Sequence, residues 1–301
     1  MRTTTVDDRS VVHACAVPVS DEQLWETTAA FLAAGLTAGE QVVYFDDGTA
    51  EAVLDRLVDD RVPVHRPLSD GQLTVVEPER TREALRVPVR DAAAGLAALI
   101  DGAVSAGYPG FRWTGQLSYG LQRRGGLGLA DYDGVIDTVL CGRPARALCL
   151  YDRRRFPDDA VEHLRALHRV EIEAPALYDD NLLRVTRVGP FRLRMAGEVD
   201  HSNRPVLHRL VAATLDDALR SHDAPDVLEI DLASLRFLDV AGAVALVHSA
   251  EEFPQSHRLA LTWVRPAVLR VLDRCGAPFA AQLDVSAHPG LPPPAVPGRA
   301  R

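Results

Sequence analysis

The chain has 301 residues, of which 47% are hydrophobic and 25% charged, the composition of a folded protein long enough for two domains. All 33 cationic side chains are arginines, which excludes a P-loop lysine, a Schiff-base lysine and a lysine general base. The net charge of −9, without basic clusters interleaved with aromatic residues, argues against a direct nucleic-acid partner.

The two halves of the chain differ in charge. Up to residue 180 there are 29 acidic residues and 19 arginines, and after residue 180 there are 13 acidic residues and 14 arginines.

The first ten residues lack an apolar signal core, and no apolar run approaches the roughly 18 residues of a membrane span. We therefore expect a cytoplasmic protein with no membrane contact and a flexible segment 1–10. Its four cysteines are expected to be thiols.

Short apolar strands and amphipathic helices alternate up to residue 170. Ser20 and Gln23 form a capping-box pattern that opens the first helix, which ends at Gly39. The predicted strands are 11–19, 41–45, 73–76, 110–114 and 145–151, and further helices are predicted over 49–60 and 88–106. This order predicts an α/β fold with a parallel sheet, helices on both faces and ligands at the carboxyl ends of the strands.

A second pattern follows residues 171–181, whose acidic and irregular sequence predicts a linker. Strands 182–187 and 191–195 are predicted to form a hairpin, and Ser202 or Asn203 to cap a helix. Strands 227–232 and 259–264 alternate with helices 239–247 and 266–275. These elements predict a smaller α/β domain over 182–287, and the proline-rich tail 288–301 is expected to be disordered.

The smaller domain resembles a STAS domain, the fold of anti-sigma factor antagonists. The resemblance rests on GEVD at 197–200 and on EIDLASLRFLDVAGAVAL at 229–246, in which an acidic strand precedes a capping aspartate. In many family members a phosphorylated serine follows that aspartate, whereas Val240 and Ala241 stand here. The resemblance therefore implies docking on an anti-sigma factor or related regulator without a phosphoserine. The docking candidates are Asp200, Asp239, Val240, Ala241 and Gly242, and the alternative is that Asp239 is only a helix cap.

Residues 11–170 resemble the MEDS sensory domain, which is thought to derive from a RecA-like fold without a P-loop. Four motifs carry the resemblance: HAC at 13–15, GEQVVYF at 39–45, GYPGFRWTGQLSYGL at 107–121 and ALCLYDRRRFP at 147–157. It implies that this half senses a small organic ligand. The turn after the first strand, PVSDEQ, has no glycine-rich phosphate cradle, which argues against ATP hydrolysis.

His13, Cys15 and Cys149 lie on the first and last predicted strands of this domain, with Tyr151 close by. One imidazole and two thiolates would suit a soft metal, but no fourth ligand and no zinc-type spacing is evident. The alternatives are buried thiols packed on one face of the sheet or a ligand pocket, and the pocket is favoured over the metal. We expect no metal and no cofactor.

Three polar residues alternate along another strand of this domain. Arg112, Thr114 and Gln116 share one face of it, which suits a polar contact set for a ligand. Trp113 points the other way and is expected in the core. The resemblance makes Tyr151 and Asp152 further pocket candidates.

The sequence predicts a non-catalytic signalling protein that senses a ligand or partner and docks on a regulator. Neither a Gly-x-Ser-x-Gly nor a His-Glu-x-x-His motif is present. The alternatives are a degenerate RecA-like nucleotide-binding protein or weak ATPase, and a scaffold that binds no small molecule. The exclusive use of arginine and the abundant alanine indicate a high-GC genome, as in actinobacteria.

Overall fold

The computed structural model describes residues 2–5, 11–116, 118 and 128–289. They divide into two compact units, Met1–Ala174 and Pro175–Arg301. None of the described helices is both long and apolar enough to span a bilayer.

The first unit is built on a parallel sheet. Within the described residues it has seven strands, in the order β1 (Arg2–Thr4), β7 (Val170–Ile172), β2 (His13–Ala16), β6 (Ala145–Leu150), β5 (Phe111–Gln116), β3 (Gln41–Phe45) and β4 (Leu73–Val76). Each neighbouring pair runs parallel. The predicted α/β fold with a parallel sheet is confirmed.

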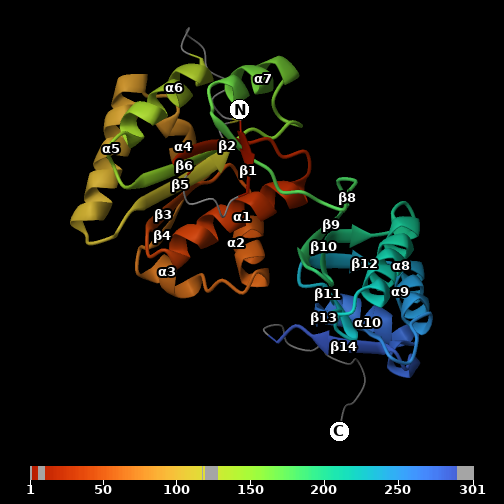
Figure 1. The fold of residues 1–301 in the computed structure, drawn as a ribbon. Helices are drawn as coiled ribbons and strands as arrows, with labels where there is room; N and C mark the ends of the chain where they lie inside the picture. The colour runs from red at the N-terminus through yellow and green to blue at the C-terminus, as the bar shows by residue number, and fades with distance from the viewer. Residues whose placement is uncertain (1, 6–10, 117, 119–127, 290–301) are drawn as a thin grey trace, which may run out of the picture. The chain divides into compact units, whose positions relative to one another are not determined.

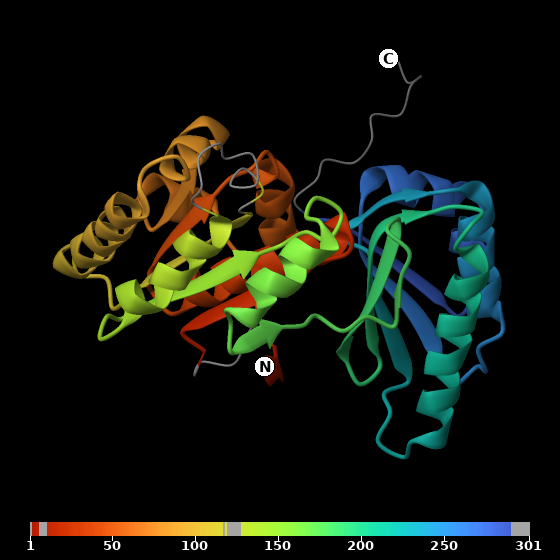
Figure 2. The same ribbon diagram turned by 90° about the horizontal axis from the view of Figure 1, so that it is seen from above.

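Helices cover both faces of this sheet (Figure 1 and Figure 2). Helices α1 (Asp21–Thr37) and α2 (Ala50–Asp59) pack over Val42, Tyr44 and Leu73 on one face. Helices α5 (Val89–Ser105), α6 (Leu129–Leu140) and α7 (Asp158–Ala166) pack over the other face. Two short helices, α3 (His65–Ser69) and α4 (Pro78–Ala84), flank β4. Because side chains alternate along a strand, even-numbered residues of β5 and β6 face α1 and odd-numbered ones face α5 and α6.

The second unit has a mixed sheet. Its strand order is β14 (Leu283–Ala287), β13 (Arg258–Val264), β11 (Val227–Asp231), β10 (Arg192–Val199), β9 (Leu183–Gly189) and β8 (Tyr178–Asp179), and β12 (Leu235–Leu238) also pairs with β10. Strands β9 and β10 form the predicted antiparallel hairpin. Helices α8 (Arg204–Arg220), α9 (Val240–Glu251) and α10 (Pro266–Arg274) share one apolar core with the sheet. The smaller α/β domain is thus confirmed.

The ends of the two units differ from the prediction. Residues 2–4, expected to be flexible, form β1 and pair with Val170, Glu171 and Ile172 of β7, because the open edge of β7 offers main-chain partners. The expected linker 171–181 contains most of β7 and all of β8, so the division falls between residues 174 and 175. His288, expected in the tail, is buried and makes an edge-to-face contact with the ring of Trp263. Residues 6–10 and 290–301 of the two predicted disordered segments lie outside the described residues.

Candidate functional site

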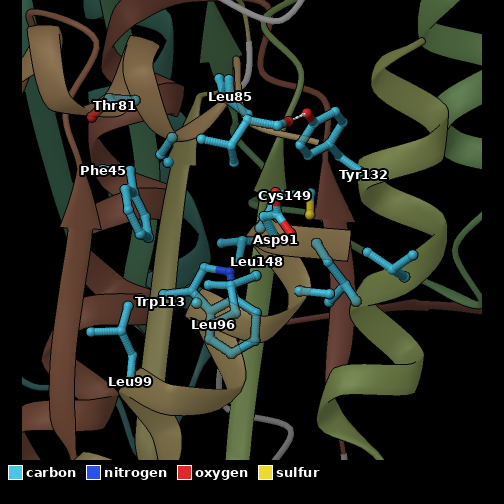
Figure 3. A pocket seen from close by; sticks show the side chains of 18 residues that line it. Phe45, Thr81, Leu85, Asp91, Leu96, Leu99, Trp113, Tyr132, Leu148 and Cys149 are labelled. Atoms are coloured by element: carbon cyan, nitrogen blue, oxygen red, sulfur yellow. Dashed lines mark hydrogen bonds between the residues drawn. The ribbon is translucent and has the colours of Figure 1, made fainter. Parts of the chain in front are cut away.

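The first unit contains a cavity of about 450 Å³ beneath α5 (Figure 3). Strands β3, β5 and β6 form its floor, and α4, α5 and α6 supply its walls. Most of its lining is apolar, with main contributions from Phe45, Leu85, Leu96, Trp113, Tyr132 and Cys149. Its size and lining are typical of small-molecule sites.

The backbones of β3 and β5 approach each other closely at the floor of the cavity. Gly115 of β5 lines the cavity, and a Cβ atom there would lie 2.6 Å from the carbonyl oxygen of Phe45 on β3, so only glycine fits. Trp113, two residues earlier, is expected in the core by the sequence. It packs in the core cluster and also lines the cavity. The side of β5 that faces the cavity is therefore the side of Trp113.

Two polar groups in the cavity wall are already hydrogen-bonded to the main chain. The hydroxyl of Thr81 donates to the carbonyl of Val76 at 3.2 Å, and the hydroxyl of Tyr132 donates to the carbonyl of Val87. A ligand gains little by displacing such bonds. The cavity therefore suits a molecule with a predominantly apolar body.

A buried polar cluster lies next to the cavity and shares Cys149 with it. The thiol of Cys149 donates to Oδ1 of Asp133 at 3.1 Å, and the hydroxyl of Tyr151 donates to its Oδ2 at 2.8 Å. His13 Nε2 lies 3.5 Å from the Cys149 sulfur and 3.6 Å from Asp133 Oδ1. His168 Nε2 lies 3.5 Å from Asp133 Oδ2. We call His13, Asp133, Cys149 and His168 the four-residue cluster.

Burial and charge act on each group of this cluster. Burial opposes ionisation of Asp133, but hydrogen bonding with His13 and the charge of His168 outweigh it and lower the pKa of Asp133. Burial also acts against a charged His13, yet bonding to Asp133 and Asp137 raises the pKa of His13. Burial lowers the pKa of His168. Burial, reinforced by Asp133, raises the pKa of Cys149 well above its usual value, so this thiol is not an activated nucleophile.

The structure brings together only part of the cysteine and histidine set predicted on β2 and β6. His13, Cys149 and Tyr151 converge as expected. Cys15 pairs in register with Cys149, but its sulfur lies near the carbonyl of Val170 at 3.8 Å, and burial raises the pKa of Cys15 to about 12. Cys15 is therefore a neighbour of the four-residue cluster and not a member of it.

Sequence reasoning missed Asp133 and His168. Asp133 lies on α6 among the buried residues Leu129, Tyr132 and Ile136. No helix was predicted over 129–140; an aspartate within its apolar periodicity would have been the signal, because buried carboxylates need partners. His168 follows α7 and had no comparable signal, since its place depends on how α7 packs.

Arg112, Thr114 and Gln116 lie on the opposite face of β5 from the cavity. Arg112 forms an ion pair with Glu40 at 2.6 Å and lies 4.7 Å from the ring centre of Phe31. Thr114 donates to the carbonyl of Leu148 at 2.8 Å. The buried amide of Gln116 has no hydrogen-bond partner among the described residues. These residues do not join the cavity, and Arg112 and Thr114 stabilise packing on the α1 side.

The carboxyl edge of the sheet carries an ion-pair network. Asp152 binds Arg154 at 2.8 Å and lies 3.6 Å from Arg155, and Arg155 binds Asp47 at 2.6 Å. Asp152 is fully buried, so its carboxylate requires these partners. Tyr151, its neighbour in sequence, points instead into the four-residue cluster.

In the second unit the predicted docking residues gather at the start of α9. Asp239 caps the helix by accepting from the amide of Gly242 at 2.5 Å, and it pairs with Arg204 at 2.9 Å. Val240 is 66% exposed, whereas Gly242 is buried and Ala241 half-buried.

Asp200 lies close to this helix start. It follows Val199, whose carbonyl accepts from the amide of Asp239, and its own carboxylate accepts from Ser202. Asp200, Asp239 and Val240 therefore lie at one end of the unit.

Family comparisons agree with this division of the chain. The MEDS family, described as the methanogen/methylotroph, DcmR sensory domain, matches residues 12–169, and a STAS domain of the Mlab type matches residues 185–277. Neither match indicates an enzyme family, and together they indicate a regulatory or signalling role. A comparison with curated proteins finds no match.

Two solved structures are similar to parts of the chain. An anti-sigma factor antagonist from Mycobacterium paratuberculosis has 23% identity and a TM-score of 0.28, over 34% of this chain and 83% of that one. The flagellar accessory protein FlaH from Methanocaldococcus jannaschii has 8% identity and a TM-score of 0.41, over 61% and 77%. Because the MEDS match spans more than half of the residues, the chain belongs to the MEDS family, with a STAS domain after its sensory domain.

Proposed function

We propose that the chain is a non-catalytic, cytoplasmic signalling protein. Its MEDS domain binds a small apolar molecule in the cavity beneath α5, and its STAS domain docks on an anti-sigma factor or related regulator. Ligand binding acts by favouring one arrangement of the sensory domain over another. The observation that carries the proposal is the apolar cavity itself, of about 450 Å³, next to buried polar groups.

The docking half of the proposal rests on the exposed start of α9. Val240 and Phe237 are 66% and 48% exposed, on either side of the capping Asp239. Exposed apolar side chains beside an ion pair are typical of protein-binding surfaces. Without a hydroxyl at residues 240 and 241, no phosphate can control docking at this position, so binding is constitutive with respect to phosphorylation.

The ligand proposal is tested by calorimetry on the full chain, with benzene, cyclohexanol and 1-octanol as probes. We expect at least one probe to bind the wild type. Leu96→Trp should fill the cavity and weaken binding at least tenfold. The matched control Leu96→Met, which conserves volume, should bind like the wild type. Binding that is absent in the wild type, or equal in both variants, would overturn the proposal.

The docking proposal is tested with the purified anti-sigma factors encoded in the source genome. Val240→Arg should weaken binding of the cognate partner at least tenfold, because it places a charge in the contact. The control is Val227→Arg, since Val227 is 42% exposed at the other end of the same sheet. Equal affinities of the two variants, or no partner in the set, would contradict it.

The alternative of a nucleotide-binding protein has less support. At the turn where a RecA-like fold would hold phosphate, Ser20 Oγ accepts from the amide of Gln23 at 3.1 Å, and Gln23 Oε1 accepts from the amide of Val19 at 2.9 Å. These amides are therefore already engaged by the cap. Magnesium-dependent ATP binding to the full chain would favour the alternative over the proposal.

A further inference from the structure

We propose that the four-residue cluster, His13, Asp133, Cys149 and His168, binds a divalent transition metal ion of the Zn²⁺ type. These residues come from β2, α6, β6 and the turn after α7, so the fold and not a local motif assembles them. One ligand atom from each lies within 4.8 Å of all the others. The proposal is independent of the ligand in the cavity and of STAS docking.

The spacing of the donor atoms fits tetrahedral coordination. A zinc ion with bonds of about 2.0–2.3 Å holds its ligand atoms roughly 3.2–3.8 Å apart. The Cys149 sulfur lies 3.1 Å from Asp133 Oδ1 and 3.5 Å from His13 Nε2, and His13 Nε2 lies 3.6 Å from Asp133 Oδ1. Three of the donors thus already stand at nearly the separations that such an ion requires.

The fourth donor is a buried nitrogen without a hydrogen bond. His168 has no exposed side-chain surface, and its Nε2 has no hydrogen-bond partner among the described residues although it points at Asp133 from 3.5 Å. An unpartnered buried imidazole nitrogen costs free energy unless something occupies it. Coordination of a metal ion would satisfy this atom.

Both imidazoles are held in the orientation that metal binding needs. His13 Nδ1 lies 2.8 Å from the carboxylate of Asp137, and His168 Nδ1 lies 2.9 Å from the carbonyl of Leu164. Each acceptor fixes the proton on Nδ1 and leaves Nε2 free to coordinate, as the outer partners of zinc-bound histidines do. Tyr151 holds the Asp133 carboxylate in the same way, by donating at 2.8 Å.

Charge balance also favours this ligand set. On binding, Cys149 loses its thiol proton to solvent and becomes a thiolate, and a proton held on His13 Nε2 is released to solvent as well, so that both imidazoles bind as neutral rings. One thiolate and one carboxylate then neutralise a divalent cation in a buried place. One sulfur, two nitrogens and one oxygen match the preferences of zinc and not those of calcium or magnesium.

The test uses Co²⁺ as a spectroscopic substitute on the full chain after removal of metals with EDTA. We expect about one equivalent of Co²⁺ to bind, with thiolate-to-cobalt charge-transfer absorption and the intense visible bands of a tetrahedral site. Zn²⁺ should displace it. Cys149→Ser should abolish the charge-transfer absorption, and the matched control Cys15→Ser should retain it.

A variant outside the buried cluster keeps the test decisive if Cys149→Ser does not fold. Asp137→Ala removes the outer partner of His13 at a side chain that is 61% exposed, and it should weaken Co²⁺ binding about tenfold. Thr138→Ala, an exposed neighbour on the same helix, should bind Co²⁺ like the wild type. The proposal is overturned if the wild type shows no charge-transfer absorption, if Cys15→Ser abolishes it, or if Asp137→Ala and Thr138→Ala have equal affinities.

Discussion

The two units use buried carboxylates and helix ends differently. In the sensory unit, Asp133 is 1% exposed and contacts four side chains inside the protein, next to an apolar cavity. In the STAS unit, the side chain of Asp239 is 25% exposed and serves the first turn of a surface helix. The comparison teaches that the first unit keeps its polar groups in the interior, beside a cavity, whereas the second places them at the exposed start of a helix.

The largest loss of stability is expected from a substitution at Asp133. Replacement by leucine leaves the Tyr151 hydroxyl and the Cys149 thiol without their common acceptor in a buried place, so Asp133→Leu should lower the free energy of unfolding by about 3–5 kcal/mol. Equilibrium urea unfolding measures this. Asp137→Asn, at the exposed partner of His13, should cost less than about 1 kcal/mol. Similar losses for both variants would mean that the interior cluster is not the stabilising one.

One glycine in a helix of each unit, Gly242 and Gly134, is expected to respond differently to replacement by alanine. A Cβ at Gly242 of α9 would lie 2.7 Å from Val199 and 2.9 Å from Leu238, so Gly242→Ala should cost about 1–3 kcal/mol through overpacking. A Cβ at Gly134 of α6 would meet nothing within 4 Å, so Gly134→Ala should stabilise by about 0.5–1 kcal/mol. Thermal unfolding of the two variants measures whether each substitution lowers or raises stability. A loss of stability at Gly134 would show that the sensory unit is packed more tightly around α6 than the structure indicates.

Asp180 lies just before β9 of the STAS unit, and its contribution to stability depends on pH. Burial favours the neutral form of Asp180, but hydrogen bonds from the amide of Leu183 and the hydroxyl of Tyr178 outweigh it and lower the pKa of Asp180 below 3.8. Ionised Asp180 therefore contributes its full stabilisation at pH values above the pKa that it has in the unfolded chain. This stabilisation is lost as the pH falls through the lowered pKa of the folded state. Asp180→Asn should cost about 1 kcal/mol at pH 7, and the difference from the wild type should shrink on acidification. A difference that does not change with pH would exclude this origin.

The smallest effect on stability is expected at Val240. Because this side chain is 66% exposed, Val240→Ser should change the free energy of unfolding by less than about 0.5 kcal/mol, while creating an acceptor hydroxyl at the start of α9. After incubation with an anti-sigma kinase and ATP, mass spectrometry should find no phosphate within residues 234–249 of the wild type. Ser234 and Ser249 are only 2% and 3% exposed. A phosphate on either of them would refute the absence of a switch.

Much of the fold followed from local sequence. Strands 41–45 and 73–76 have the predicted bounds, and helices 49–60 and 88–106 differ by one residue at each end, because hydrophobic periodicity and caps are local signals. Strands β1, β7, β8, β12 and β14 and helices α3, α4 and α6 were not predicted. Strands β1, β7 and β12 are three or four residues long and are stabilised by pairing with a strand distant in sequence, which no local pattern reveals.

The candidate site was less predictable than the fold. His13, Cys149 and Tyr151 were found because their strands are adjacent in a parallel sheet. The cavity was missed because an apolar cavity wall and an apolar core have the same residue types, so Trp113 was assigned to the core alone. Arg112 was predicted to face a ligand, but alternation along β5 only shows which residues share a face and not which face holds the cavity.

The central claim is that a ligand enters beneath α5 and changes the start of α9. Hydrogen–deuterium exchange on the full chain, with and without a saturating bound probe such as 1-octanol, tests it most directly. The account predicts slower amide exchange within 89–105 and altered exchange within 239–243. Unchanged exchange across 89–105 at saturation would contradict the proposed site, and a change confined to 89–105 would contradict its coupling to the STAS surface.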